Sequence, residues 1–298
     1  MNNEPIVSVL ITAYNREKFI GEAIESVLAS SYSSFELIIV DDSSSDNTFE
    51  VAKSYTLEDS RIHLYRNTTN LGQFANRNRA ASLAKGEFLK YLDSDDILYP
   101  NALEHFVNSL KKYPTAVIGI ACHNNISCQP NSLFLISGKD ALFSHYLKGD
   151  KFLYTGPSGT IFKKKTFDSL GGFKTSGGIL NDTLLMLMLT EEGDVAIINR
   201  DLFHWRIHEN QITVGQKNEF NMIIERHAIN REVLFNDNSN LDEITRMRIW
   251  KKMKIIYVRN IFIKFFLKGY FMLGINLLVL GKITFKDILR SFTFSRNI

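Results

Sequence analysis

Apolar and polar positions form two alternating kinds of segment along the N-terminal half of the chain. Nearly continuous apolar runs occur at residues 6–14, 35–42 and 87–93, the pattern of strands buried on both faces. Residues 61–67 form a further predicted strand, so that 87–93 is the fourth. Between the first two, residues 18–30 place apolar side chains three and four positions apart, as in an amphipathic helix. Strands that alternate with helices predict an α/β fold with a mostly parallel sheet flanked by helices.

The alternation becomes looser after about residue 115. Residues 116–122 and 195–200 still have strand patterns, and residues 181–193 form a helical pattern. Beyond about residue 215 the chain is helical and basic to its end. We therefore expect two regions, an α/β domain at 1–215 and a helical, basic C-terminal region at 216–298.

Polar side chains follow three of the predicted strands, at the point where each strand ends. In sheets of this type, ligands bind outside the carboxyl ends of the strands, so these groups should surround one crevice. They are Thr12, Tyr14, Asn15 and Arg16 after the first strand, Asp41 and Asp42 after the second, and Asp93, Ser94, Asp95 and Asp96 after the fourth.

The cluster after the fourth strand needs positive charge, because neighbouring carboxylates repel one another. Mg²⁺ or Mn²⁺ prefers oxygen ligands, and Mg²⁺ is typically held by one or two carboxylates together with substrate phosphates. The alternative is a turn in which Asp96 caps the next helix. An EF-hand starting at Asp42 fails, because Asn47 and Lys53 stand where glycine and glutamate are needed. Neither glycine-rich nucleotide-binding motif is present.

Three motifs together carry a family resemblance. They are VSVLITAYNREKFIGEAIESVL, FELIIVDDSSSDNT and NLGQFANRNRAASLAKGEFLKYLDSDD. In this order and spacing, from residue 7 to residue 96, they resemble the nucleotide-sugar half of family-2 inverting glycosyltransferases. The resemblance implies a GT-A-type fold and metal-dependent transfer of a hexose or N-acetylhexosamine from a nucleotide-diphosphate sugar. Uridine diphosphate is the favoured nucleotide, with guanine and thymine open as bases.

The resemblance also implies roles for individual residues by position. Asp95 matches the main metal ligand of the D-x-D motif. His208, within HWRIHENQIT, resembles the family's late histidine and is a candidate for metal or phosphate contact. The residues expected to bind the nucleotide sugar are Thr12, Tyr14, Asn15, Arg16, Asp41, Asp42, Arg77, Asp93 and Ser94.

The same resemblance implies a general base in an acidic pair that opens a later helix. Here Asp182 takes the position of the base, while Asn181 replaces the usual first acid. The alternative role for Asp182 is helix capping. Further along this helix, Glu191 and Glu192 are expected to be exposed.

Charge is distributed unevenly along the chain. The net charge is +3, but residues 246–298 hold 12 Lys and Arg against one acid, which gives +11 there and −8 in the remainder. The basic, aromatic end suggests an anionic membrane surface as partner, and residues 261–281 fit an amphipathic surface helix better than a spanning one. A solvated or core-packed helix, or a homodimer contact, is the alternative.

The composition indicates the class of protein and the cellular compartment. The chain is 45% hydrophobic and 22% charged, which indicates a folded protein rather than a disordered one. Its two cysteines cannot form a disulfide framework, and the N-terminus lacks the pattern of a secretory signal. We expect a cytoplasmic protein, at the cytoplasmic face of a membrane if the basic end binds lipid, with no nucleic-acid partner.

Three functions remain open from the sequence. The leading hypothesis is transfer of a sugar to a hydroxyl of a glycan or lipid-linked acceptor, in cell-surface polysaccharide synthesis. A sugar-phosphate nucleotidyltransferase is less compatible, since the loop after the first strand has no glycine before Gly21. A non-catalytic glycan- or membrane-binding protein on a degenerate transferase fold is the third, because Asn181 departs from the acidic pair.

Overall fold

The computed structural model describes residues 5–122, 131–176, 178–208, 216–237, 239–263 and 271–293. The chain divides into two units. The first contains Met1–Gly138, Lys151–Ser176 and Asn181–His208, and the second contains Lys139–Asp150, Gly177–Leu180 and Glu209–Ile298.

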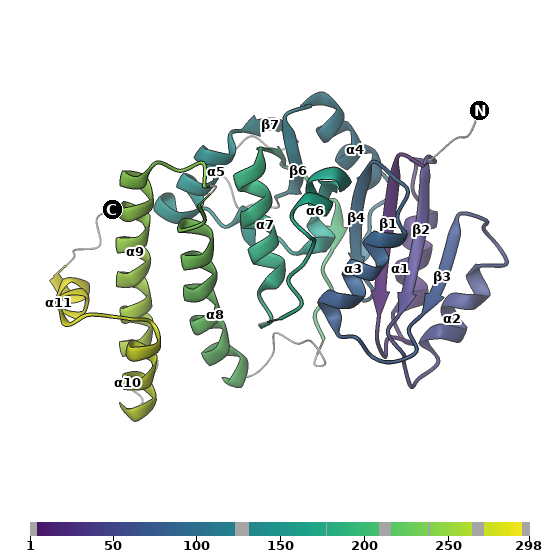
Figure 1. Cartoon of the computed structure of the whole chain (residues 1–298). Helices are drawn as coiled ribbons and strands as arrows, with labels where there is room; N and C mark the ends of the chain where they lie inside the picture. Colours follow the sequence, from purple (N-terminus) through teal and green to yellow (C-terminus); the bar gives the residue numbers. More distant parts are fainter. Residues whose placement is uncertain are drawn as a thin grey trace. The chain divides into compact units, whose positions relative to one another are not determined.

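An eight-stranded sheet forms the centre of the first unit (Figure 1). In sheet order the strands are β3 (Ile62–Arg66), β2 (Phe35–Asp41), β1 (Val7–Ala13), β4 (Phe88–Asp93), β8 (Thr160–Lys163), β6 (Ala116–Ala121), β9 (Asp194–Ile198) and β7 (Leu133–Ile136). The first four run parallel, β6 and β9 run parallel, and β8 runs antiparallel to both β4 and β6. The predicted mostly parallel sheet is confirmed.

Helices cover both faces of this sheet. On one face α1 (Ile20–Leu28) and α4 (Ala102–Lys112) pack against apolar side chains of β1, β2 and β6. The other face carries α3 (Gln73–Leu83) and an aromatic cluster of Tyr91, Phe162, Phe167 and Phe173. The remaining helices of this unit are α2 (Thr48–Tyr55), α6 (Lys164–Ser169) and α7 (Asn181–Glu192).

A second, two-stranded sheet connects distant parts of the first unit. β5 (Ile97–Leu98) pairs antiparallel with β10 (Phe203–His204). β5 directly follows the acidic cluster after β4, and β10 directly precedes the segment with His208. The pairing therefore brings His208 close to the carboxylates, although more than a hundred residues separate them in sequence.

The second unit is helical. It contains α8 (Gln216–Leu234), α9 (Glu243–Ile261), α10 (Phe271–Leu280) and α11 (Phe285–Thr293), with most of α5 (Gly138–Phe143) and a π-helical turn at Ser144–Lys148. The His227 ring stacks on Trp250 and Tyr257, and the Tyr257 hydroxyl donates to the Leu277 carbonyl over 2.8 Å. These contacts join α8, α9 and α10 around a small core.

Two predictions concern parts of the chain that are not fully described. The boundary predicted near residue 215 lies at the edge of residues 209–215, outside the described residues, so the division into 1–215 and 216–298 stays a prediction. Residues 264–270 of the predicted surface helix also lie outside them. Within the described helices, none is both long enough and apolar enough to cross a bilayer.

Candidate active site

The carboxyl ends of β1, β2 and β4 lie at the same edge of the sheet. Thr12 is paired with Asp93 across β1 and β4, and Ala13 is paired with Asp41 across β1 and β2. The Asp42 N–H then donates to the Ala13 carbonyl over 2.8 Å. Polar residues from three strand ends are thus brought together, as the parallel pattern predicts.

The loop after β1 is locked to the loop after β2. The Asn15 N–H donates to Ser44 Oγ over 2.9 Å, and Asn15 Oδ1 accepts from the Ser45 N–H over 2.9 Å. The backbone of Asn15 has a positive φ of 52°, a conformation that asparagine tolerates better than most residues. Tyr14 is left 47% exposed at the mouth of the site, where a flat ring is available for stacking.

Asp41 and Asp42 are both buried but differ in their partners. Asp42 accepts hydrogen bonds from Asn67 Nδ2 and from the N–H groups of Leu71 and Gly72, so its carboxylate anchors the segment before α3. Asp41 Oδ2 lies 3.1 Å from Arg66 Nε. Asp41 Oδ1 has no hydrogen-bond partner in the described part of the chain. Asp41 therefore keeps one buried acceptor unsatisfied.

Arg77 holds Asp93. Its Nη2 atom donates to Asp93 Oδ1 over 2.5 Å, and Arg77 is only 3% exposed. The guanidinium carbon lies 5.8 Å and 5.5 Å from the ring centres of Phe74 and Phe173, positions that favour a cation. Arg77 is thus buried beside the acidic cluster.

Asp95 and His208 form the centre of the site. Asp95 Oδ2 lies 2.9 Å from His208 Nε2 and 3.3 Å from Arg16 Nε. The His208 ring stacks on Phe19, with ring centres 4.8 Å apart. Arg16 also donates to the carbonyls of Tyr14 and Asn15. Residues from two distant segments, Arg16 and His208, are thus held at one carboxylate.

Asp96 has a structural role beside this centre. It is 2% exposed and accepts from the Arg206 N–H and from the Ser158 side chain. Burial, together with the charge of Asp93, raises the pKa of Asp96 to about 7. Ser158 Oγ also accepts from the Asp93 N–H over 3.0 Å, so Ser158, which the sequence reading did not single out, fixes the acidic turn. Ser94, 6% exposed, lies within the same turn.

The donor set suits a hard divalent cation that is also held by a ligand. Among the described residues no three His, Cys, Asp or Glu side chains are arranged to hold a metal by themselves. However, Asp95 Oδ2 and His208 Nε2 face each other over 2.9 Å, and one or two protein ligands are what Mg²⁺ needs when phosphates complete its shell. The site therefore fits a metal–diphosphate complex better than a protein-only metal site.

Asp182 lies at the start of α7, half-buried, where its Oδ1 accepts from the Thr183 N–H over 2.6 Å. Desolvation raises the pKa of Asp182, and the charge of Asp93 adds to this, while Arg77 opposes it. Asp182 thus lies within electrostatic range of the Arg77–Asp93 pair. A carboxylate whose pKa is raised is better suited to accept a proton.

Asn181 has a structural reason to differ from an acid. It is 4% exposed, and its Nδ2 donates to the carbonyls of Lys174 and Ser176 over 2.7 Å and 3.3 Å. A carboxylate here would face two carbonyl oxygens and lose both bonds. On the same helix the expectation that Glu191 is exposed is wrong, because it lies 6% exposed on a helix packed on nearly all sides, whereas Glu192 is exposed.

Lys90 is a buried cation in the strand below the acidic turn. It is fully buried, and its Nζ donates to the carbonyls of Tyr91 and Ser158 and lies 4.9 Å from the centre of the Phe106 ring. Burial lowers the pKa of Lys90 to about 7, although the charges of Asp93 and Asp96 oppose the shift. Lys90, the one charged residue within the apolar run 88–92, is thus held by two carbonyls and an aromatic ring.

The lowered pKa predicts a pH-dependent stability. Between about pH 7 and the ordinary lysine pKa, the unfolded chain binds more protons than the folded one, so stability rises with pH. The wild type should gain about 2 kcal/mol in free energy of unfolding between about pH 7 and about pH 9 that Lys90→Met does not gain. Urea denaturation of both proteins measures this. Lys53→Met, at a side chain 62% exposed, is the control, and parallel profiles for Lys90→Met and wild type would contradict the prediction.

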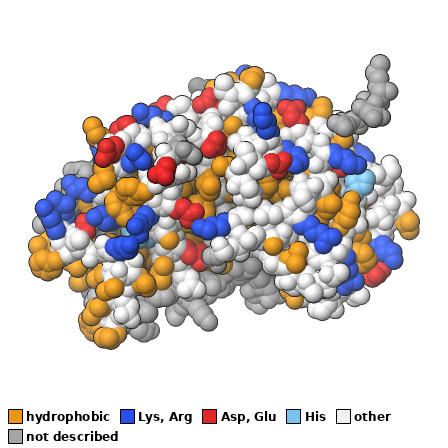
Figure 2. Space-filling view, in the orientation of Figure 1, with side chains coloured by type: hydrophobic (Ala, Val, Ile, Leu, Met, Phe, Trp, Pro, Cys, Tyr) orange, Lys and Arg blue, Asp and Glu red, His pale blue; other side chains and the backbone are white. Residues whose placement is uncertain are grey.

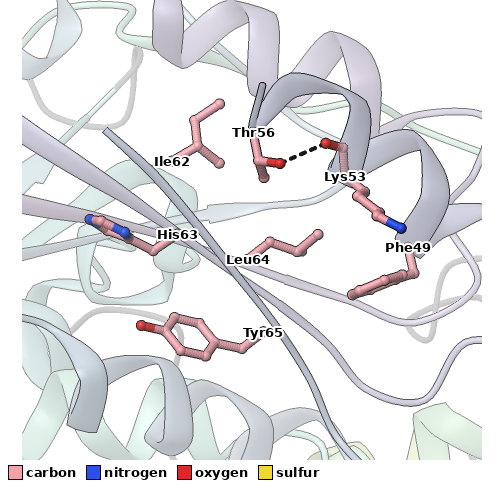
Figure 3. Close-up of a pocket in the computed structure, with 7 residues that line it drawn as sticks. All are labelled: Phe49, Lys53, Thr56, Ile62, His63, Leu64 and Tyr65. Atoms are coloured by element: carbon pink, nitrogen blue, oxygen red, sulfur yellow. Dashed lines mark hydrogen bonds between the residues drawn. The ribbon is translucent and has the colours of Figure 1, made fainter. Parts of the chain in front are cut away.

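An open hollow of about 430 Å³ lies elsewhere in the first unit, over α2 and β3 (Figure 3). Its lining residues are Phe49, Lys53, Thr56, Ile62, His63, Leu64 and Tyr65. None of them is a predicted site residue, so we assign it no role in the site.

Comparison with known proteins identifies the family. The family model "Glycosyl transferase family 2" matches residues 8–165, more than half of the chain. The chain belongs to glycosyl transferase family 2. The matched residues include β1, β2 and β4 and the acidic turn, and they end before Asp182 and His208.

Two curated relatives are similar to this family-2 chain over part of its length. "Putative glycosyltransferase EpsE" of Bacillus subtilis (strain 168) is 42% identical over 114 residues, covering 38% of this chain and 41% of the relative. "Putative colanic acid biosynthesis glycosyl transferase WcaA" of Escherichia coli (strain K12) is 37% identical over 139 residues, covering 45% and 49%. The chain thus matches less than half the length of these relatives.

Solved structures share the fold of this family-2 chain. S. aureus TarS 1-349 in complex with UDP-GlcNAc has a TM-score of 0.64 at 19% identity, covering 83% of this chain and 71% of that one. Mannosyltransferase PcManGT from Pyrobaculum calidifontis, in complex with GDP-Man and Mn²⁺, has a TM-score of 0.63 at 14% identity, covering 97% and 79%. At these identities the likeness shows the fold alone, and it confirms the predicted GT-A-type architecture.

Proposed function

We propose that this protein is a metal-dependent, inverting glycosyltransferase. It would move a hexose or N-acetylhexosamine from a nucleoside-diphosphate donor to a hydroxyl of a glycan or lipid-linked acceptor. The observation that carries the proposal is the acidic turn after β4, where Arg77 Nη2 donates to Asp93 Oδ1 over 2.5 Å and Asp95 Oδ2 lies 2.9 Å from His208 Nε2. Asp182, in the first turn of α7, would be the base. The name of the WcaA relative refers to colanic acid biosynthesis, which supports a role in polysaccharide synthesis.

The donor would bind at the carboxyl ends of β1, β2 and β4. Tyr14 offers an exposed ring to the base. In this proposal an N–H of the base reaches Asp41 Oδ1, which is buried and has no hydrogen-bond partner among the described residues. Asp42 shapes this pocket through its bonds to the segment before α3. Uracil remains the favoured base on the family resemblance, although thymine and guanine also offer an N–H to a carboxylate acceptor. Thr12, Asn15 and Ser94 lie at the strand ends around it.

The diphosphate would lie at Asp95, His208 and Arg16. A bound Mn²⁺ or Mg²⁺, held by Asp95 and His208, would supply charge stabilisation for the departing phosphate oxygen. Arg16 adds a fixed positive charge there, and Arg77 keeps Asp93 oriented toward the ribose side. The stacking of His208 on Phe19 restricts the orientation of its imidazole.

The chemical step then needs one proton acceptor. The acceptor oxygen forms a bond to the anomeric carbon while the bond from that carbon to the phosphate oxygen breaks, and the electron pair leaves with the nucleoside diphosphate. The acceptor oxygen attacks on the face opposite the leaving group, so the anomeric configuration inverts, and Asp182 takes the hydroxyl proton.

The C-terminal region at 216–298 would place this chemistry at its acceptor. We propose that it contacts the cytoplasmic face of a membrane, where a lipid-linked glycan would be extended; a homodimer contact is the alternative.

Nucleotide binding gives the first test of this function. Nucleoside diphosphates should raise the melting temperature by mass action, with a larger shift in the presence of Mn²⁺ and for one base above the others. Differential scanning fluorimetry with a panel of nucleoside diphosphates measures this. A shift without turnover of the matching nucleotide sugar would instead favour a non-catalytic binding protein, and no shift for any nucleotide would contradict the proposed site.

A further inference from the structure

Helix α11 is amphipathic, and it has its polar face inward. Asp287 and Ser291 are 6% and 1% exposed, whereas Phe285, Leu289 and Phe292 are 74%, 53% and 56% exposed. The three apolar residues follow one another at intervals of four and three positions, so they form one stripe. A helix of a globular protein normally turns such a stripe toward the core.

Specific bonds hold α11 in this orientation on α9. Lys254 Nζ donates to Asp287 Oδ1 over 2.8 Å, and Arg259 Nε donates to the Ser291 carbonyl over 2.8 Å. Thr284 caps the start of α11, since its Oγ1 accepts from the Asp287 N–H over 3.2 Å and its own N–H donates to Asp287 Oδ2 over 3.1 Å. Rotating the apolar stripe inward would break this set of bonds.

Helix α10 adds a second exposed apolar face. It carries no charged residue, and Met272, Ile275, Val279 and Leu280 are 72%, 47%, 71% and 65% exposed. No helix among the described residues is long and apolar enough to cross a bilayer. Apolar surface on four side chains of one helix marks a contact site.

The positive charge around α10 and α11 favours an anionic partner. Residues 246–298 contain 12 Lys and Arg and one acid, Asp287, which is buried against Lys254. Lys282 and Lys286 are exposed beside the stripe. Figure 2 shows hydrophobic and basic side chains gathered together over this part of the chain. A second copy using the same face would bring two cationic surfaces together, whereas anionic headgroups would neutralise them.

We propose that the exposed faces of α10 and α11 dock this protein on an anionic lipid bilayer. The apolar stripe of α11 and the exposed residues of α10 lie at the boundary between headgroups and acyl chains, and Lys282 and Lys286 contact lipid phosphates. Docking itself stands on the helices alone. That it serves a lipid-linked acceptor rests on the transferase function proposed above.

Co-sedimentation of the full chain with vesicles tests the docking. The wild type should bind vesicles of phosphatidylcholine mixed with phosphatidylglycerol and bind pure phosphatidylcholine far less, with binding reduced by salt. Phe285→Ser combined with Phe292→Ser should lower the partition coefficient about tenfold or more. Lys282→Gln combined with Lys286→Gln should lower it about tenfold on the anionic vesicles only.

Two controls separate docking from other effects. Leu57→Ser, at a leucine 90% exposed in the first unit, should bind vesicles like the wild type. The nucleotide-induced melting shift without lipid should be the same in all variants, so a failure of docking is distinguishable from a failure of the transferase site. Equal vesicle binding by the double phenylalanine variant, or no binding by the wild type, overturns the proposal. A lipid-free dimer that this variant converts to a monomer in sedimentation velocity also overturns it, in favour of a second copy.

Discussion

Replacing Asp182 by asparagine is expected to lower kcat by about 10²–10⁴-fold, the usual contribution of a general base. The side chain keeps its shape and can still accept from the Thr183 N–H, so the fold and the donor site should be retained. Release of nucleoside diphosphate during transfer measures the loss. The melting shift produced by nucleotide should remain, because Asp182 is assigned to the acceptor proton and not to the donor.

The pH dependence of activity provides a second test of Asp182 as the general base. Asp182 must be ionised to accept a proton, and desolvation raises its pKa above the ordinary value. Activity of the wild type should therefore fall as pH decreases through this raised pKa, and the residual activity of Asp182→Asn should lack that acidic limb. Glu192→Gln removes an exposed carboxylate from the same helix and serves as the matched control. If Asp182→Asn retained wild-type kcat, Asp182 would be a capping residue only.

The strands that form the donor side could be predicted closely from the sequence. The apolar run at 6–14 corresponds to β1 at Val7–Ala13, and the run at 35–42 corresponds to β2 at Phe35–Asp41. Such strands are buried on both faces, so their composition is constrained along their whole length. Because the carboxyl ends of parallel strands share an edge, the pattern predicted that Thr12 and Asp93 lie around one crevice, whereas the pairing of β1 with β4 came from the structure.

Other parts of the site depend on contacts that a linear pattern does not contain. The approach of His208 to Asp95 requires the pairing of β5 with β10, two strands of two residues each, which are too short to produce a period. The family resemblance pointed to His208, but no spacing did. Ser158 binds the acidic turn through a 3₁₀ turn at Pro157–Gly159, where the sequence shows only turn-forming residues.

Asn181 shows how a departure from a family pattern can be read physically. Without the structure, an amide in place of an acid suggests a degenerate site. In the structure the amide satisfies two carbonyls that an acid would repel, so its presence does not weaken the case for Asp182. Desolvation and the charge of Asp93 raise the pKa of Asp182, and the charge of Arg77 opposes them.

Replacing Asp95 by asparagine should remove the metal-dependent part of nucleotide binding. The amide oxygen can still accept from Arg16 and His208, so local structure is kept, but the negative charge that a hard cation requires is lost. We expect kcat/KM to fall by about 10²–10³-fold, the scale of losing one electrostatic contact to a departing charge. Transfer assays with increasing Mn²⁺ measure both effects, and Glu50→Ala, at a side chain 66% exposed on α2, is the control.

Asp182→Asn and Asp95→Asn should affect different parts of the reaction, namely proton transfer from the acceptor and metal-dependent binding of the donor. Asp182→Asn should preserve the additional melting shift that Mn²⁺ gives to nucleotide, whereas Asp95→Asn should reduce the shift to its metal-free value. Since Asp95 and His208 share one contact, His208→Ala should act in the same direction as Asp95→Asn, and the double variant should lose less than the product of the single losses. Independent, multiplicative losses would mean that Asp95 and His208 do not hold the same ion, and the metal–diphosphate assignment would then fail.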